Sequence, residues 1–146
     1  MATWTKSADA GIYPFRVDVG FRHLDLDVQK LITNVAIAEC FEEGRTKYSI
    51  DRRLKGAFDP HRRILSELRI WYGEDAKYPG GVQVSVGVGA ITENSWTLHL
   101  LATQEKRCVA RCESQFQLLS GDQLVALPDG LAQILRKDLI DVGHDA

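Results

Sequence analysis

Apolar and polar residues alternate along four stretches in the second half of the chain. The stretches are 62–71, 81–90, 96–103 and 106–118. In 81–90, for example, four valines fall on one side, and polar residues and glycines fall on the other. Alternation with a period of two predicts strands that bury one face. The connections between the last three stretches are short and Glu93-Asn94 is typical of a hairpin turn, so antiparallel pairing is expected.

The first half of the chain follows a different pattern. Residues 12–21 predict a first strand, and a polar loop follows it. The next segment, 32–41, is apolar on almost every side, and a helix without a polar stripe must be covered by other structure. This buried helix is predicted over about 33–48, with Thr33 or Asn34 as the residue that caps its start.

Two further segments complete the prediction. Residues 51–61 form a charged connector that contains a glycine and a proline. Residues 127–140 close the chain with a short helix, and Asp129 is its expected cap. Repeats, low-complexity segments and linkers are absent from the sequence, so residues 1–146 are expected to form one domain with a core over about 12–137.

The order of these elements predicts the fold class. A strand and a long helix are followed by a run of antiparallel strands that are apolar on one face. A helix and a sheet of this kind bury their apolar surfaces against each other. The prediction is an α+β fold in which a curved antiparallel sheet wraps around the long buried helix.

Composition and charge narrow the class of protein. The 146 residues are 45% hydrophobic and 26% charged, as in a globular domain with a real core. The net charge of −2 gives no electrostatic reason to expect a nucleic acid or a membrane as a partner. The N-terminus carries no apolar signal region, and Cys40, Cys108 and Cys112 are expected to be small core residues, so the expected location is the cytoplasm.

The polar loop before the helix is the first candidate for chemistry. Asp25 and Asp27 lie one residue apart in it. A carboxylate attacks a carbonyl or activates water, and the N–H groups at the start of a helix stabilise the negative charge that develops. Aspartates in loops are also common as turn residues and helix caps. The residues alone therefore leave both roles open for Asp27.

The same region resembles a known family. The chain reads Leu-Asp-Leu-Asp at 24–27, Asn at 34 and Phe-Glu-Glu-Gly-Arg at 41–45. This pattern is similar to the signature of the hot-dog fold acyl-CoA thioesterase superfamily, and in particular of its 4-hydroxybenzoyl-CoA thioesterase-like branch. The spacing from Asp27 to 41–45 matches that signature without a gap. The resemblance extends over roughly 12–137 and implies a hot-dog fold and the hydrolysis of an acyl-CoA thioester to a free acid and CoA.

The resemblance also implies roles for single residues. Asp27 falls at the position of the catalytic aspartate, and the backbone N–H of Asn34 falls at the position that stabilises the oxyanion. Asp25 is expected to orient the loop. His23 is a secondary candidate that would tune Asp25, although a lone loop histidine is more often a surface residue. Glu39 is another secondary candidate, with exposure to solvent as the more common alternative.

Several residues depart from the family pattern: Thr33 stands where the family has the first of two asparagines, and Ile37 and Cys40 stand where it has tyrosines. Lys30-Leu31 stands where the family has Gly-His or Gly-Val. Glycine at the first of these positions lets the loop backbone come close to the thioester. The alternative function is therefore a non-catalytic hot-dog protein that binds an acyl thioester or another apolar ligand. A third possibility is an interaction module in which the loop with Asp25 and Asp27 is only a capped turn.

The family further implies how substrate and partner subunit are arranged. The expected assembly is a homodimer or a dimer of dimers, joined edge to edge, with the acyl chain at the interface. The substrate would be an acyl-CoA or an acyl-carrier-protein thioester, and CoA would enter only as part of the substrate, without a separate cofactor. The four histidines show no spacing typical of metal ligands. The residues expected along the pantetheine are Asn94, Ser95 and Trp96, and those expected at a phosphate are Arg62, Arg63 and Lys77.

Overall fold

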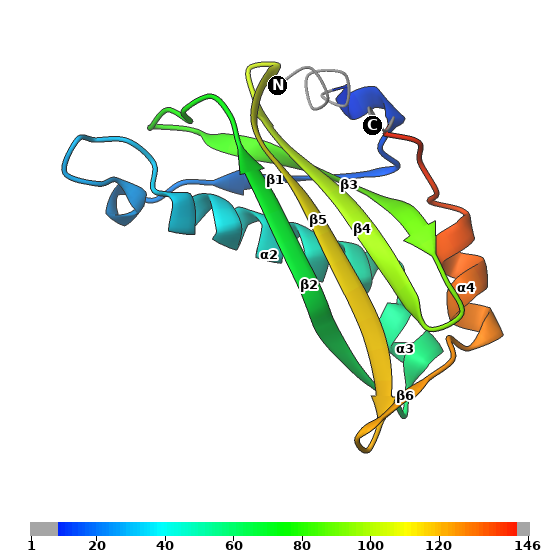
Figure 1. Ribbon diagram of the computed structural model, residues 1–146. Coiled ribbons are helices and arrows are strands. Elements are labelled where there is room, and N and C mark those ends of the chain that lie inside the picture. The colour runs from blue at the N-terminus through cyan, green and yellow to red at the C-terminus, as the bar shows by residue number, and fades with distance from the viewer. Residues whose placement is uncertain (1–8, 143–146) are drawn as a thin grey trace.

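The computed structural model describes residues 9–142. Its centre is one curved antiparallel sheet with the strand order β1-β3-β4-β5-β2, and β6 adds to β5 (Figure 1). The strands are β1 (Phe15–Gly20), β2 (Arg62–Tyr72), β3 (Gly81–Ile91), β4 (Ser95–Gln104), β5 (Arg107–Ser120) and β6 (Gln123–Val125). The four predicted strands of the second half and their antiparallel pairing are therefore confirmed.

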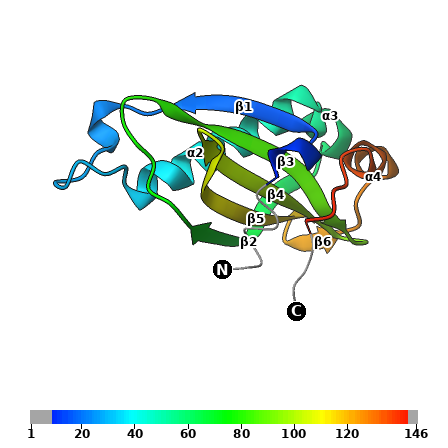
Figure 2. The same ribbon diagram turned by 90° about the horizontal axis from the view of Figure 1, so that it is seen from above.

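One long helix lies along a single face of this sheet. Figures 1 and 2 show α2 lengthwise on the sheet, with two short helices grouped near one end of it. The helices are α2 (Asn34–Asp51), α3 (Leu54–Phe58) and α4 (Asp129–Arg136), and the 3₁₀ turns are η1 (Ala10–Ile12) and η2 (His23–Asp25). This arrangement confirms the α+β class and the hot-dog fold.

The core lies between α2 and the sheet. The valine face of β3 is buried, as its alternation predicted. Phe41 and Tyr48 of α2 are fully buried against the sheet, and Cys40 and Cys112 belong to the same core. A Cβ added at Gly44 would come within 2.5 Å of Val84, so glycine at this position lets helix and sheet approach closely.

The prediction that α2 is covered on every side is wrong. The sheet covers one side of the helix, and a row of residues on the other side is exposed. The exposed residues are Asn34, Val35, Glu39, Glu42, Glu43, Thr46, Lys47, Ile50 and Asp51. Within 32–41, Ala36, Ile37, Cys40 and Phe41 are buried, whereas Val35 and Glu39 are exposed.

Smaller differences concern the short elements. The first strand spans Phe15–Gly20 rather than 12–21. The connector at 51–61 contains the five-residue helix α3. Pro128 precedes α4 as its N-cap residue, so Asp129 is the first helical residue and not the cap. Short elements such as α3 and β6 carry too few residues for a periodic pattern to show.

A bulge in β2 changes which of its residues face α2. The register with β5 shifts between Leu65 and Glu67, so Leu65 and Leu68 lie on the same face although they are three residues apart. Both are 43% exposed. Within residues 9–142, β2 pairs only with β5, and its other edge is open.

Candidate functional site

The loop that carries Asp27 is held by its own backbone. The N–H of Asp27 donates to the carbonyl of Leu31 over 2.8 Å. In return, Asp27 Oδ1 accepts the N–H groups of Gln29 at 2.8 Å and Leu31 at 3.0 Å. The side chain is exposed, and its second oxygen, Oδ2, forms no hydrogen bond with any residue that the structure describes. One oxygen therefore fixes the carboxylate, and the other remains available to a ligand.

Lys30 preserves the turn in this loop. Its φ of 64° lies in the left-handed region, which glycine adopts easily and other residues adopt at a cost. Its N–H donates to the carbonyl of Asp27 over 3.0 Å, and its side chain points into solvent. The chain thus adopts a glycine-like turn without glycine. Leu31, which stands where the family has histidine or valine, is partly exposed and brings no polar group.

The loop leads directly into the start of α2. Thr33 is the cap, since its Oγ1 accepts the N–H of Ala36 over 3.1 Å, and Asn34 is the first helical residue. The N–H groups in the first turn of a helix have no acceptor within the helix and lie at its positive end. The carbonyl of Asn34 accepts a hydrogen bond from the Tyr72 hydroxyl of β2 over 3.3 Å. This bond joins the helix start to the edge strand.

Asp25 is buried next to the start of the loop. Its carboxylate is buried and accepts the backbone N–H of Arg22 at 2.7 Å and the Arg22 guanidinium at 3.0 Å. The backbone hydrogen bond from Arg22, with the guanidinium beside it, holds the pKa of Asp25 below its ordinary value. The carbonyl of Asp25 accepts the N–H of Thr33 over 2.9 Å. Asp25 therefore fastens the loop to the start of α2.

The structure places the two secondary candidates outside this arrangement. His23 is exposed, and its ring packs edge-on against Tyr78 with centroids 6.0 Å apart. Arg22, rather than His23, is the polar partner of Asp25. Glu39 is exposed on the outer side of α2, which agrees with the alternative that it faces solvent.

The three residues expected along the pantetheine lie at the other end of the sheet. β3 begins beside the end of β1 that leads to the Asp27 loop, and ends at the hairpin that carries Asn94. Its ten residue steps span about 33 Å. Ser95 bonds Thr92 at 2.6 Å, and the buried Trp96 stacks on a phenylalanine of β5. A single chain therefore does not bring these residues to Asp27.

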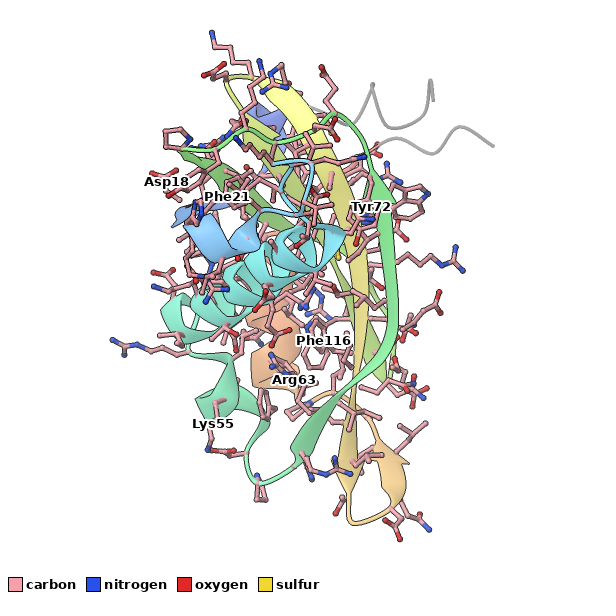
Figure 3. The ribbon with its side chains drawn as sticks, turned by 90° about the vertical axis from the view of Figure 1, so that its left-hand side faces the viewer. Asp18, Phe21, Lys55, Arg63, Tyr72 and Phe116 are labelled. Atoms are coloured by element: carbon pink, nitrogen blue, oxygen red, sulfur yellow. The ribbon has the colours of Figure 1, made fainter. Side chains whose placement is uncertain are left out.

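The three basic candidates are divided between the ends of the molecule. Arg62 and Arg63 begin β2, at the end away from the loop (Figure 3 labels Arg63 beside Phe116). The Arg63 guanidinium lies 4.7 Å from the centre of the Phe116 ring, and burial lowers its pKa. Lys77 lies in the connection between β2 and β3, where its backbone N–H donates to Gln104 over 2.8 Å.

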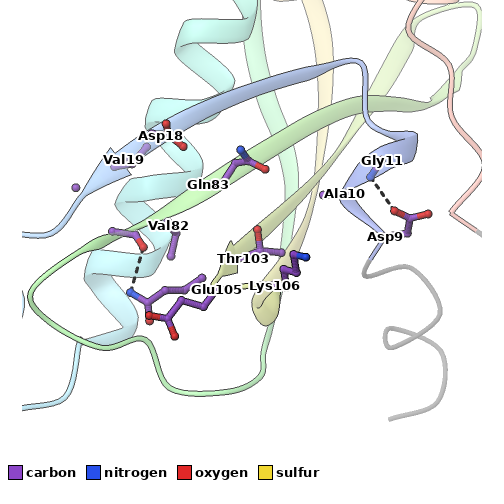
Figure 4. A pocket seen from close by; sticks show the side chains of 13 residues that line it. Asp9, Ala10, Gly11, Asp18, Val19, Val82, Gln83, Thr103, Glu105 and Lys106 are labelled. Carbon is purple, nitrogen blue, oxygen red and sulfur yellow. Dashed lines mark hydrogen bonds between the residues drawn. The ribbon is translucent and has the colours of Figure 1, made fainter.

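A large open pocket is lined by other residues than those of the Asp27 loop. It has a volume of about 710 Å³ and lies between η1, β1, β3 and the β4–β5 turn (Figure 4). Its charged side chains are Asp9, Asp18, Glu105 and Lys106. None of the candidate site residues lines it. Its size alone does not make it the site.

Sequence reasoning did not identify two residues that shape the candidate site. Arg22 stands three residues before Asp25, a spacing that permits an ion pair across one turn. Tyr72 lies 38 residues from Asn34, and only the tertiary structure brings them together. In residues 9–142, no three His, Cys, Asp or Glu side chains gather as metal ligands. None of the helices in this part of the chain is long and apolar enough to cross a bilayer.

Comparison with known proteins gives structural relatives only. No family model and no curated sequence matches this chain. A predicted thioesterase from Bacillus stearothermophilus superposes with a TM-score of 0.78 and 21% identity, over 88% of this chain and 98% of the other. A thioesterase from Thermus thermophilus, solved with coenzyme A and zinc, gives 0.74 and 21% over 86% and 94%. The 12:0-ACP thioesterase of Umbellularia californica gives 0.77 and 16%, over 90% of this chain and 56% of the other. These neighbours have the hot-dog fold, and so does this chain.

Proposed function

We propose that the protein hydrolyses an acyl thioester to a free acid and a thiol. The observation that carries the proposal is the Asp27 carboxylate, which is fixed through Oδ1 and free at Oδ2, just ahead of the unpaired N–H groups of α2. The match to the family signature at 24–27 and 41–45 supports it, and the thioesterases among the structural neighbours agree with it. Within the superfamily, the signature favours the 4-hydroxybenzoyl-CoA thioesterase-like branch.

The proposed mechanism uses the Asp27 carboxylate and the backbone N–H of Asn34. The thioester carbonyl oxygen would accept the N–H of Asn34, at the positive end of the helix. Asp27 would take a proton from water while the oxygen of that water attacks the carbonyl carbon. The C–S bond then breaks, and the departing sulfur takes the proton back from Asp27. Direct attack by Asp27, through a mixed anhydride that water then hydrolyses, uses the same geometry.

The proposed assembly is a homodimer joined along β2. Its open edge runs along the eleven residues of β2, whose backbone groups that point away from β5 are unpaired, and the exposed Leu65 and Leu68 lie beside it. An isolated edge of this length invites pairing with a second chain. Antiparallel pairing about a two-fold axis would set the Tyr72 end of one strand beside the Arg62 end of the partner's strand. Trp96 lies on β4, two strands away from Leu65 of β2. In the dimer, the partner's Trp96 would lie nearer to the Asp27 loop of this chain than this chain's own Trp96 does.

A non-catalytic binding protein is the second candidate. The two backbone bonds to Asp27 Oδ1 are also those of an aspartate that only closes a turn. Leu31 adds no group that would assist proton transfer. This candidate predicts that acyl thioesters bind and are not turned over.

The test is the release of free thiol from a panel of acyl-CoA and acyl-carrier-protein thioesters of varied chain length and aromaticity. The wild type, Asp27→Ala and Glu39→Gln are compared, the last as an exposed carboxylate close by on α2. Turnover by the wild type and Glu39→Gln that disappears in Asp27→Ala is the expected result. Equal turnover by Asp27→Ala would refute the assigned role. Binding without turnover by the wild type would favour the second candidate.

A further inference from the structure

Positive charge is concentrated in one short segment of the chain. Residues 45–63 contain seven of the 18 Lys and Arg residues and only two of the 20 acidic residues. The segment therefore carries a charge of +5, and the rest of the chain carries −7. This asymmetry does not appear in the net charge of −2. It indicates a surface that attracts anions within a protein that is otherwise acidic.

The fold gathers part of this charge around one pocket. A pocket of about 490 Å³ lies between the C-terminal half of α2, α3 and the start of β2. Its basic side chains are Lys55, His61, Arg62 and Arg63, which we call the basic rim. Figure 3 shows Lys55 and Arg63 at the same end of the molecule, near α3. Its apolar part includes Phe58, which is buried, and Ile50, which is 69% exposed.

Most of the charge on the basic rim is not neutralised within the chain. Lys55 pairs with Asp59, which also lines the pocket, but both side chains are largely exposed. Among the described residues, no carboxylate pairs with Arg62 or Arg63. Arg53, just before α3, is exposed and likewise without a carboxylate partner in residues 9–142. An exposed apolar residue beside such cations is typical of a surface that meets a partner.

We propose that the basic rim docks an acidic carrier protein that delivers the acyl group as a thioester on its prosthetic arm. This inference rests on the proposed thioesterase function and names its substrate class. Complementary charge would orient the carrier and speed its association, and the exposed Ile50 would contact apolar residues of the carrier. The same site is expected to be indifferent to thioesters that lack a carrier.

A free CoA nucleotide fits the rim less well. Tight phosphate sites use backbone N–H groups at a helix start or in a glycine-rich loop, in addition to basic side chains. Here the cations come from the ends of long side chains on α3 and β2, and α3 has only five residues. Separate, exposed cations around an apolar centre match a broad protein surface better than a compact phosphate group.

The proposed dimer places the rim within reach of the chemistry. Along one chain, Ile50 lies 16 residues from Asn34 on the same helix, or about 24 Å. Antiparallel pairing of β2 instead sets Arg62 of one subunit beside Tyr72 of the partner, which bonds the start of the partner's α2. A carrier docked on one subunit would thus deliver its acyl group to the partner's Asp27.

The test uses the double variant Lys55→Glu/His61→Glu, which places two negative charges on the basic rim and leaves the strand β2, with Arg62 and Arg63, unchanged. Lys106→Glu, in the β4–β5 turn, is the matched control. Binding of an acyl-carrier protein is measured at low and high ionic strength. Hydrolysis is measured with that protein, with acyl-CoA and with acyl-N-acetylcysteamine, which has neither carrier nor phosphate. The double variant is expected to bind the carrier protein roughly tenfold more weakly or worse, and high salt to weaken the wild type likewise.

The outcomes separate this inference from the proposed function. Salt-sensitive carrier binding that is lost only in the double variant supports docking, even if no thioester is hydrolysed. Unchanged turnover of acyl-N-acetylcysteamine in the double variant shows that the Asp27 site is intact. An acyl-CoA KM that rises in the double variant, without any binding of the carrier protein by the wild type, would make the rim a nucleotide site and overturn the inference. Equal carrier binding by all three proteins would overturn it as well.

Discussion

The two ends of α2 are built in opposite ways. At its C-terminal end, Tyr48 donates to Asp138 over 2.7 Å, and Arg52 donates to the same carboxylate over 2.7 Å. The Arg52 guanidinium also lies over the rings of Phe15 and Tyr48. At its N-terminal end, the loop is exposed and held mainly by backbone hydrogen bonds within a few residues. One end thus anchors distant parts of the chain, and the other presents groups to solvent.

The C-terminal end of α2 is built to stabilise the fold, and the N-terminal end carries the groups proposed for catalysis. Burial and the bond to Asp138 both raise the pKa of Tyr48, which therefore stays protonated and keeps donating its hydrogen bond. The segment after α4 then continues past Asp138 to bond β3 through Val88. By contrast, Asp27 can be changed without opening the core. Substitutions at the first end should reduce stability, and those at the second should reduce activity.

The largest expected effect is that of Asp27→Asn on turnover. Asparagine keeps Oδ1 as the acceptor for Gln29 and Leu31, so the loop should hold its shape. The charge needed to attack or to accept a proton is lost. We expect kcat to fall about 10²- to 10⁴-fold, with the free energy of unfolding within about 0.5 kcal/mol of the wild type. Thiol release measures kcat, and urea unfolding measures the free energy of unfolding. A large loss of stability would show that the N-terminal end of α2 also stabilises the fold.

Asp138→Ala should have the opposite signature. It leaves the Tyr48 hydroxyl buried without an acceptor and removes the carboxylate that holds Arg52, so we expect a loss of about 3 kcal/mol in the free energy of unfolding. Asp51→Ala is the control, because it removes the exposed partner of the same arginine and should cost less than about 1 kcal/mol. Urea unfolding compares them. Equal midpoints for the two variants would show that Asp138 is no anchor.

Local patterns predicted more of this molecule than long-range contacts did. The valine alternation in β3 and the threonine before α2 were sufficient because both signals lie within a few residues. The bulge at Leu65 was not predictable, since it depends on the partner strand, and it decides which residues of β2 face α2. Asp138 and Tyr48 are 90 residues apart, and neither local sequence predicts the hydrogen bond between them.

In the candidate site, too, local patterns were more informative than long-range contacts. The family signature selected Asp25 and Asp27, and the structure adds the bonds of Asp25 to Arg22. Asn94 was expected beside the same substrate, yet it lies at the far end of the sheet. Which residues meet across the edge of β2 depends on a second chain, and neither the sequence nor a single subunit specifies that pairing.

Tyr72→Phe tests how far the edge strand positions the start of α2. The bond from its hydroxyl to Asn34 is long, at 3.3 Å, and Tyr72 is partly exposed. Its loss should lower kcat/KM about 2- to 10-fold, the equivalent of one hydrogen bond, and change stability little. Tyr78→Phe, at the same end of the molecule, is the control, since its hydroxyl has no such bond to Asn34. Identical kinetics for the two variants would remove Tyr72 from the site.

The smallest effect is expected for Lys30→Gly. This substitution tests whether the backbone just before α2 is strained. Lys30 and Arg53 have similar left-handed φ values, 64° and 54°, one just before α2 and one just after it. Glycine relieves a cost of about 1 kcal/mol at such a position, and the greater freedom of the unfolded chain offsets part of that gain. Lys30→Gly should therefore raise the free energy of unfolding by about 0.5 kcal/mol and leave kcat within about twofold.

Two control variants accompany Lys30→Gly. Lys30→Ala separates the contribution of the side chain from that of the backbone, and Arg53→Gly makes the same substitution at the C-terminal end of α2. A stability gain at both positions with unchanged turnover would mean that the strain is incidental. A loss of turnover confined to Lys30→Gly would mean that the stiffness of the lysine turn holds Asp27 in place, and so that the exposed end of α2 is rigid where its chemistry requires it.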